Sequence, residues 1–196
     1  MAIRKHENPI TLFHEWFEEA KTCGLREPTA VCLSTADATG MPSSRMILYK
    51  KADDRGFVFY TNLGSQKVQD LRDNPRAALC FYWMPLGKQV RIEGSVESVS
   101  DEEADAYFAS RDRQSQIGAW ASKQSQPLEG YFDLERRAAE YAIKFGISKV
   151  PRPSFWSGYR IIPNRMEFWL EKPFRLHERL NYTRTEQGWT ARWLFP

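Results

Sequence analysis

Two segments in the first third of the chain combine cationic residues with features that favour anion binding. Residues 44–51 form an apolar strand on which Arg45 and Lys50 point to opposite faces, so both faces need anionic partners. Residues 60–67 contain a strand end, a glycine turn and a helix start with Lys67, an arrangement that suits a phosphate. The competing interpretation is snorkelling side chains at a strand end and a plainly capped helix.

A second anion site is indicated further along the chain. Tyr107 and Arg111 are four positions apart and therefore share one face of a predicted helix, and Ser115 follows shortly after. These three side chains supply hydrogen-bond donors that converge on one anion. The competing interpretation is a surface helix with an arginine near its C-terminus.

A third cationic group is predicted on a strand near the C-terminus. Residues 174–183 have a strand pattern in which Arg175, His177 and Arg179 share one face. Such groups repel one another unless something negative or electron-rich lies over them. The competing interpretation is an edge strand that its charges keep soluble.

Hydrophobic periodicity predicts the elements that position these residues. The first helix begins at Asn8-Pro9 and ends at Cys23-Gly24, and further helices are predicted over residues 65–74, with Ser65 as N-cap, 100–110, 113–122 and 128–145. Strands are predicted over residues 29–36, 43–51, 57–61, 76–83, 88–99, 156–162, 165–171, 174–183 and 189–195, with a turn at Pro163-Asn164. Short turns indicate antiparallel neighbours, so the predicted class is α+β with an antiparallel barrel.

Composition narrows the class of protein further. The chain has 196 residues, of which 42% are hydrophobic and 27% charged, as expected for one folded domain over residues 1–196 with a short N-terminal arm, residues 1–8. A net charge of +3 is too small to indicate nucleic-acid binding, and no apolar run is long enough for a membrane helix. Three cysteines without CxxC spacing argue against a metal site and favour the reducing cytoplasm.

Taken together and in this order, the segments resemble the pyridoxamine 5′-phosphate oxidase family. The resemblance extends from about Pro9 to Pro196 and lies in residues 45–50, 58–65, 115–120, 122–125, 153–156, 167–169 and 175–177. It implies an antiparallel split β-barrel with flanking helices, which forms a homodimer with flavin mononucleotide (FMN) at the subunit interface.

The resemblance also implies a role for individual residues. Its FMN-binding positions are Arg45, Met46, Ile47, Leu48, Tyr49, Lys50, Tyr60, Thr61, Gln66, Lys67, Gln89, Gln124, Ser125, Trp169 and Arg179. Its substrate-binding positions are Lys50, Tyr107, Arg111, Ser115, Arg175, Leu176 and His177, with Arg175 and His177 over the pyridine ring as the catalytic pair.

The implied reaction oxidises pyridoxamine or pyridoxine 5′-phosphate to pyridoxal 5′-phosphate. A hydride passes from C4′ to the flavin N5, and dioxygen then reoxidises the flavin and gives hydrogen peroxide. Two features depart from the family pattern. Gln66 stands where many members have a basic residue, and the N-terminal arm is short.

Two rival functions remain. The first is a flavin-binding split barrel without this activity or with another substrate, because one fold hosts many functions. The second is a nucleic-acid-binding barrel that uses the abundant aromatic residues, 14% of the chain, although no basic run supports it. Flavin colour in the purified protein separates the second rival from the flavin hypotheses.

Overall fold

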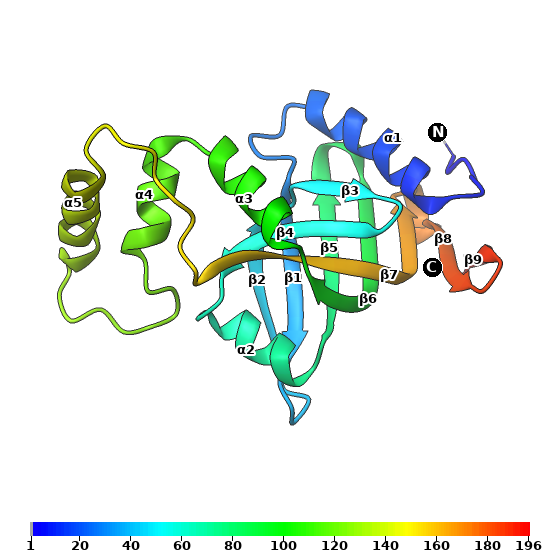
Figure 1. Ribbon diagram of the computed structural model, residues 1–196. Coiled ribbons are helices and arrows are strands. Elements are labelled where there is room, and N and C mark those ends of the chain that lie inside the picture. Colours follow the sequence, from blue (N-terminus) through cyan, green and yellow to red (C-terminus); the bar gives the residue numbers. More distant parts are fainter. Residues whose placement is uncertain (1) are drawn as a thin grey trace.

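The first helix covers one end of a curled sheet. The computed structural model describes residues 2–196, in which α1 (Pro9–Thr22) lies across the top of the sheet (Figure 1). The Asn8 side chain accepts a hydrogen bond from the Ile10 N–H at 2.9 Å, and Pro9 occupies the first turn, as predicted. Phe13, at the centre of the helix, is fully buried.

A single antiparallel sheet of nine strands forms the body of the described chain. Its order is β2-β1-β5-β6-β7-β4-β3, and β8 and β9 continue from the far half of β7. The strands are β1 (Ala30–Ala36), β2 (Pro42–Leu48), β3 (Lys51–Asp53), β4 (Gly56–Asn62), β5 (Arg76–Trp83), β6 (Lys88–Ser98), β7 (Trp156–Leu170), β8 (Glu178–Thr185) and β9 (Gly188–Leu194). This sheet confirms the predicted antiparallel split-barrel class.

Aromatic rings fill the space between α1 and the sheet. Phe13 meets Phe57 edge-to-face at 4.8 Å between centroids, and it also meets Tyr49 at 5.4 Å and Phe81 at 5.2 Å. Alternate residues of β1 and β5 point into this core. Tyr49, predicted to bind the cofactor, is only 6% exposed and has its ring inside this core.

Four further helices follow along the chain. They are α2 (Gln66–Asp73), α3 (Asp101–Ser110), α4 (Arg113–Ala121) and α5 (Asp133–Phe145), and α4 and α5 stand side by side at the left of Figure 1. The prediction that the last of these starts at residue 128 is wrong by five residues. Among residues 2–196, no helix combines the length and the apolar character that spanning a membrane requires.

One predicted turn is wrong. The Pro163-Asn164 pair lies inside β7, which continues unbroken from Trp156 to Leu170. Gly94 pairs with Pro163 while Glu93 pairs with Arg165, so Asn164 is the extra residue of a β-bulge. Proline is tolerated there because a bulge does not require its missing N–H.

Two predicted strands end or begin differently, and both changes affect site residues. β2 ends at Leu48, after which the Lys50 N–H donates to Val58 O at 3.1 Å, so the chain turns a corner before β3. β8 begins only at Glu178, because Phe174 and Arg175 adopt positive φ angles of 59° and 61° in a short 3₁₀ turn. Arg175 and His177 therefore do not share a strand face with Arg179.

The N-terminal arm packs against β8. The Ile3 N–H donates to Glu178 Oε2 at 2.7 Å, and the Ile3 side chain is 6% exposed. The Tyr182 hydroxyl donates to His6 O at 3.0 Å. These contacts join residues 3–6 to the sheet.

Candidate functional site

A hollow of about 1140 Å³ gathers most of the predicted site residues. It lies between β2, the end of β4, the start of α2 and the α3–α4 region. The predicted residues that line it are Arg45, Met46, Ile47, Leu48, Lys50, Tyr60, Thr61, Gln66, Lys67, Tyr107, Arg111, Ser115, Gln124 and Ser125. Arg45 and Lys50 therefore line the same hollow. The prediction that they face opposite sides of one strand is wrong, because β2 ends at Leu48 and the chain bends between them.

Lys67 lies on one side of the hollow as a buried lysine whose hydrogen-bond partners are neutral hydroxyl groups. Its side chain is 6% exposed, and Nζ donates to the hydroxyls of Thr61 at 3.2 Å and Ser65 at 3.1 Å. Burial, reinforced by the charge of Arg45, lowers the pKa of Lys67 to about 8. A buried ammonium whose hydrogen-bond partners are neutral is suited to receive an anion.

At the start of α2, the predicted N-cap serine contacts Lys67 instead of capping the helix with its side chain. Ser65 occupies the N-cap position, but its side chain makes no capping hydrogen bond to the helix. Its hydroxyl instead accepts from Lys67 Nζ. The serine therefore contacts the lysine, and the Gln66 N–H in the first turn of α2 donates to Ser125 Oγ at 3.3 Å instead.

Arg111 marks a second position for an anion. It follows the last residue of α3, and its guanidinium lies 5.0 Å from the centroid of the Trp156 ring. Within the described chain, its NH1 atom is the one buried side-chain nitrogen or oxygen without a hydrogen-bond partner. Burial also lowers the pKa of Arg111. Tyr107 and Ser115 line the hollow beside it, as the spacing predicts.

Three parallel aromatic rings form part of the wall. Tyr60 stacks on Tyr107 at 4.0 Å between centroids and on Trp156 at 5.3 Å. Burial raises the pKa of Tyr60 to about 12, so its hydroxyl keeps its proton at neutral pH. This stack fixes the position of Tyr107 and leaves its hydroxyl available as a donor.

Gly158 makes room for the stack, and we expect its replacement by alanine to be costly. A Cβ at this position would lie 2.7 Å from the Tyr60 ring and 2.9 Å from Val99 Cγ2. We expect Gly158→Ala to lower the free energy of unfolding by about 1–3 kcal/mol, as overpacking does. Urea unfolding measures this change. Gly118→Ala is the control, because nothing lies within 4 Å of its Cβ, and it is expected to be neutral or stabilising. Equal losses in both variants would contradict the steric argument.

The loop after α4 contributes Gln124 and Ser125. Gln124 Oε1 accepts from the Thr61 hydroxyl at 3.1 Å, and Ser125 Oγ accepts from the Gln66 N–H at 3.3 Å. Ser125 has a positive φ of 69°, an uncommon conformation that the surrounding contacts must maintain. Through these hydrogen bonds, the loop after α4 contacts both the end of β4 and the start of α2.

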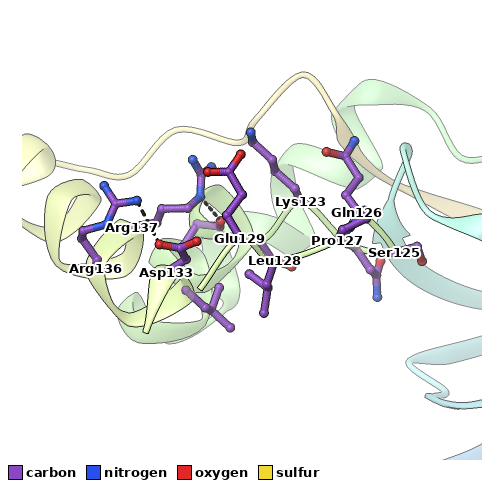
Figure 2. A pocket seen from close by; sticks show the side chains of 13 residues that line it. Lys123, Ser125, Gln126, Pro127, Leu128, Glu129, Asp133, Arg136 and Arg137 are labelled. Carbon is purple, nitrogen blue, oxygen red and sulfur yellow. Dashed lines mark hydrogen bonds and ion pairs between the residues drawn. The ribbon is translucent and has the colours of Figure 1, made fainter. Parts of the chain in front are cut away.

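Figure 2 shows the start of α5 beside this loop. The loop and the start of α5 enclose a second hollow of about 300 Å³. Arg137 Nε donates to Ala121 O, at the end of α4, at 2.7 Å. Arg136 pairs with Asp133 at 3.2 Å on the same helix. Helix α5 is thus bonded to the end of α4, from which the loop with Gln124 and Ser125 departs, and α5 does not line the larger hollow.

Apart from Tyr49, which lies in the core, the remaining predicted residues form a separate group, the β8 group. Gln89 pairs with Trp169 across β6 and β7, and Trp169 pairs with Arg179 across β7 and β8. The His177 ring lies 4.6 Å from the Trp169 ring, and its Nδ1 accepts from the Lys172 N–H. The other two members, Arg175 and Leu176, are exposed.

The β8 group does not line the larger hollow. In Figure 1, β8 lies at the opposite end of the molecule from α4. One chain therefore does not bring the two sets of predicted residues together.

Comparison with known families decides which protein family this arrangement represents. Residues 17–144 match the family described as "Pyridoxamine 5'-phosphate oxidase", and residues 156–196 match the "Pyridoxine 5'-phosphate oxidase C-terminal dimerisation region". The chain belongs to the pyridoxamine 5′-phosphate oxidase family. Its C-terminal match contains Trp169 and the rest of the β8 group apart from Gln89.

Individual relatives of this oxidase family agree over nearly the whole chain. A pyridoxine/pyridoxamine 5′-phosphate oxidase of Caulobacter vibrioides is 59% identical over 99% of this chain and 87% of its own length. One of Rhodospirillum rubrum is 52% identical over the full length of both. The solved structure of PhzG from Burkholderia lata, in complex with tetrahydrophenazine-1-carboxylic acid, has a TM-score of 0.92 and 36% identity over 97% of this chain and 94% of that one.

Sequence reasoning did not single out three residues that lie in or beside the larger hollow. Trp156 was noted only as part of a motif, yet it stacks on Tyr60 and lies under Arg111. Asp70 and Thr35 were not predicted at all, although both are buried beside Arg45. The four-residue spacing of Gln66 and Asp70 on a helix was the available signal.

Proposed function

We propose that this oxidase uses FMN to oxidise pyridoxamine and pyridoxine 5′-phosphates with dioxygen, giving pyridoxal 5′-phosphate and hydrogen peroxide. The observation that carries the proposal is the presence of two cations in one hollow, the buried Lys67 and the half-buried Arg111, whose NH1 atom is buried and unpartnered. Each needs an anion, and the cofactor and the substrate of this reaction both carry a phosphate. A hollow of about 1140 Å³ is large enough for both.

The residues around Lys67 fit the phosphate of FMN. Lys67 and Arg45 supply charge-assisted hydrogen bonds, and the N-terminal end of α2, which Ser65 does not cap, adds a favourable dipole. Gln124 and Ser125 lie beside this position with amide and hydroxyl groups that both donate and accept. When bound, FMN supplies the hydride acceptor and its reaction with dioxygen.

The residues around Arg111 fit the substrate phosphate. The unpartnered NH1 atom of Arg111, the hydroxyls of Tyr107 and Ser115, and the Lys50 ammonium all border the hollow. Together they bind a dianion and exclude water from its far side. The substrate ring is then oriented toward the cofactor, and such orientation is the main contribution that the protein makes to hydride transfer.

We infer that the β8 group completes the site of a second copy of the chain. In this homodimer, Gln89, Trp169 and Arg179 border the flavin, while Arg175 and His177 cover the pyridine ring and Leu176 lies between them. The separation of this group from the hollow supports the inference, as does the match to a dimerisation region over residues 156–196. A two-fold axis then builds two equivalent sites.

We expect the protein in solution to be a dimer. Sedimentation at micromolar concentration should give twice the chain mass of 22.9 kDa. Mixing Lys67→Ala and Arg179→Ala dimers after subunit exchange should restore about a quarter of the wild-type activity, because each mixed dimer has one intact site. A flavin-loaded monomer, or no restored activity from mixed dimers, would contradict a shared site.

The function itself is tested on the purified wild-type protein. We expect a yellow protein that releases FMN on denaturation and converts pyridoxine 5′-phosphate in air to the aldehyde, with one peroxide formed per turnover. Flavin binding without turnover of either phosphate would support the rival, a flavin-binding barrel with another substrate. Tetrahydrophenazine-1-carboxylic acid, the compound bound in PhzG, is the first alternative substrate to try.

The proposal also covers the domain organisation of the chain and the cellular compartment in which the enzyme acts. We propose that residues 1–196 form one domain in which the arm, residues 1–8, belongs to the sheet through its contacts with β8. We further propose that the enzyme acts in the cytoplasm, in keeping with its sparse free cysteines.

A further inference from the structure

A buried carboxylate lies behind the cationic end of the hollow and has no assigned role. Asp70 is 3% exposed on the inner side of α2. It accepts from the Thr35 hydroxyl at 2.6 Å and from Gln66 Nε2 at 2.8 Å, and it lies 3.6 Å from Arg45 NH2. Although burial raises the pKa of Asp70, these partners hold it below its usual range, so the side chain is charged at neutral pH.

The direction of the hydrogen bonds links Asp70 to Arg45. A threonine hydroxyl has one proton, and Thr35 gives that proton to Asp70. Its oxygen is therefore free to accept from Arg45 NH1 at 2.6 Å. Arg45 also donates to Ser43 Oγ at 2.7 Å and to Ser43 O at 3.1 Å. The guanidinium is thus held at several points, and Asp70 is its one anionic neighbour among them.

Asp70 also fixes the side-chain amide of Gln66, the residue that departs from the family pattern. The amide of Gln66 donates to Asp70 and is therefore directed along α2. With Gln66 neutral, the charges around this end of the hollow are Arg45 and Lys67 against Asp70, with Asp37 as a further nearby carboxylate. Arg45 and Lys67 repel each other, and Asp70 offsets this repulsion.

We propose that Asp70 is a positioning residue for the FMN phosphate, which holds Arg45 in place through Thr35 and keeps the pair of cations together at the start of α2. The inference rests on the proposed function, because it requires FMN as the ligand. Asp70 does not line the hollow, so it acts on the phosphate only through its neighbours.

The test measures FMN affinity of the apoprotein by fluorescence titration at pH 7. We expect Asp70→Asn to weaken binding by about fivefold to twentyfold and Thr35→Val to weaken it similarly. Because both act through one chain of hydrogen bonds, the double variant should be no weaker than about twice the worse single variant. Asp73→Asn, an exposed change on the same helix, is the matched control and should stay within twofold.

Two further measurements separate positioning from a structural role. Riboflavin, which lacks the phosphate, should bind Asp70→Asn and wild-type apoprotein within twofold of each other. FMN affinity is expected to decline at high pH, where Lys67 loses its proton. In Asp70→Asn this decline should begin at a lower pH, because the loss of a nearby negative charge lowers the pKa of Lys67 further. A loss of stability alone would change neither the difference between FMN and riboflavin affinity nor the pH at which FMN affinity declines.

The outcomes are distinct. Wild-type FMN affinity in Asp70→Asn, or equal losses for FMN and riboflavin, would overturn the role of Asp70 while leaving the proposed function intact. Absence of FMN binding by the wild-type protein would overturn the proposed function instead. Thermal unfolding of each apoprotein variant confirms that the titrated protein is folded.

Discussion

Replacing Arg111 by methionine is expected to lower kcat/KM for pyridoxine 5′-phosphate by about a hundredfold with little loss of bound FMN. The guanidinium has a buried, unpartnered NH1 atom, so its hydrogen bond to a phosphate replaces no existing protein contact. A charge-assisted hydrogen bond contributes about 1.5–3 kcal/mol, which corresponds to roughly tenfold to 150-fold. The unbranched methionine keeps most of the packing against Trp156.

Steady-state oxidation in air measures this effect, and flavin absorbance measures the FMN content. Arg113→Met is the matched control, because the Arg113 guanidinium donates to Ser148 O at 2.8 Å and does not line the hollow. We expect this control to change kcat/KM by less than about twofold to threefold. Similar activity losses in both variants would show that Arg111 supports the fold near α4, and wild-type activity in Arg111→Met would remove it from the substrate site.

The elements that the sequence predicted well are those that local pattern determines. Helix α1 has its proline, its asparagine cap and its apolar face within fourteen residues, and the β5–β6 hairpin has a turn that ends in Gly87 with a φ of 57°. Neither needs distant contacts to be recognised. The helix that starts at Asp101 likewise has its cap, Ser100, which accepts from the Glu103 N–H.

The failures occur where a distant strand decides the conformation. Pro163-Asn164 has the local pattern of a turn, but pairing with Gly94 on β6 holds it in β7 as a bulge. The local pattern at Lys50 predicts a continuing strand, but the Lys50 N–H donates to Val58 O instead of pairing with β1. These choices depend on tertiary pairing, which overrides local propensity.

The site was predictable in the same uneven way. Residues that carry charge in recognisable motifs, such as Lys67 and Arg111, line one hollow, while their binding roles stay predictions. Asp70 was missed because a lone carboxylate on a helix normally faces solvent, and only the fold places it under Thr35 and Arg45. No local pattern could place the β8 group near the hollow, since within one chain the two lie apart.

Lys67 is expected to make FMN binding depend on pH. Its pKa of about 8 in the free protein means that it is charged at pH 7 and increasingly neutral above pH 8. The bound phosphate raises that pKa, so the FMN dissociation constant should rise by up to about tenfold per pH unit above 8. The phosphate itself has its second pKa near 6 and stays dianionic throughout pH 7–9.5.

The same lowered pKa has the opposite effect on folding. Between pH 8 and the ordinary lysine pKa of 10.5, the unfolded chain binds more protons at this residue than the folded chain. The contribution of Lys67 to apoprotein stability therefore rises with pH in that window while FMN affinity falls. Unfolding caused by this residue cannot account for the loss of affinity.

Two substitutions test the assignment. Lys67→Ala should weaken FMN binding at pH 7 by roughly 30-fold to 150-fold, because it removes a charge-assisted hydrogen bond of about 2–3 kcal/mol and Gln66 provides no second charge. Lys67→Arg should retain most of the affinity and bind equally well from pH 7 to 9.5, since a guanidinium stays charged. Fluorescence titration across this range measures both. A wild-type dissociation constant that is flat to pH 9.5, or one that rises equally in the arginine variant, would place the phosphate elsewhere.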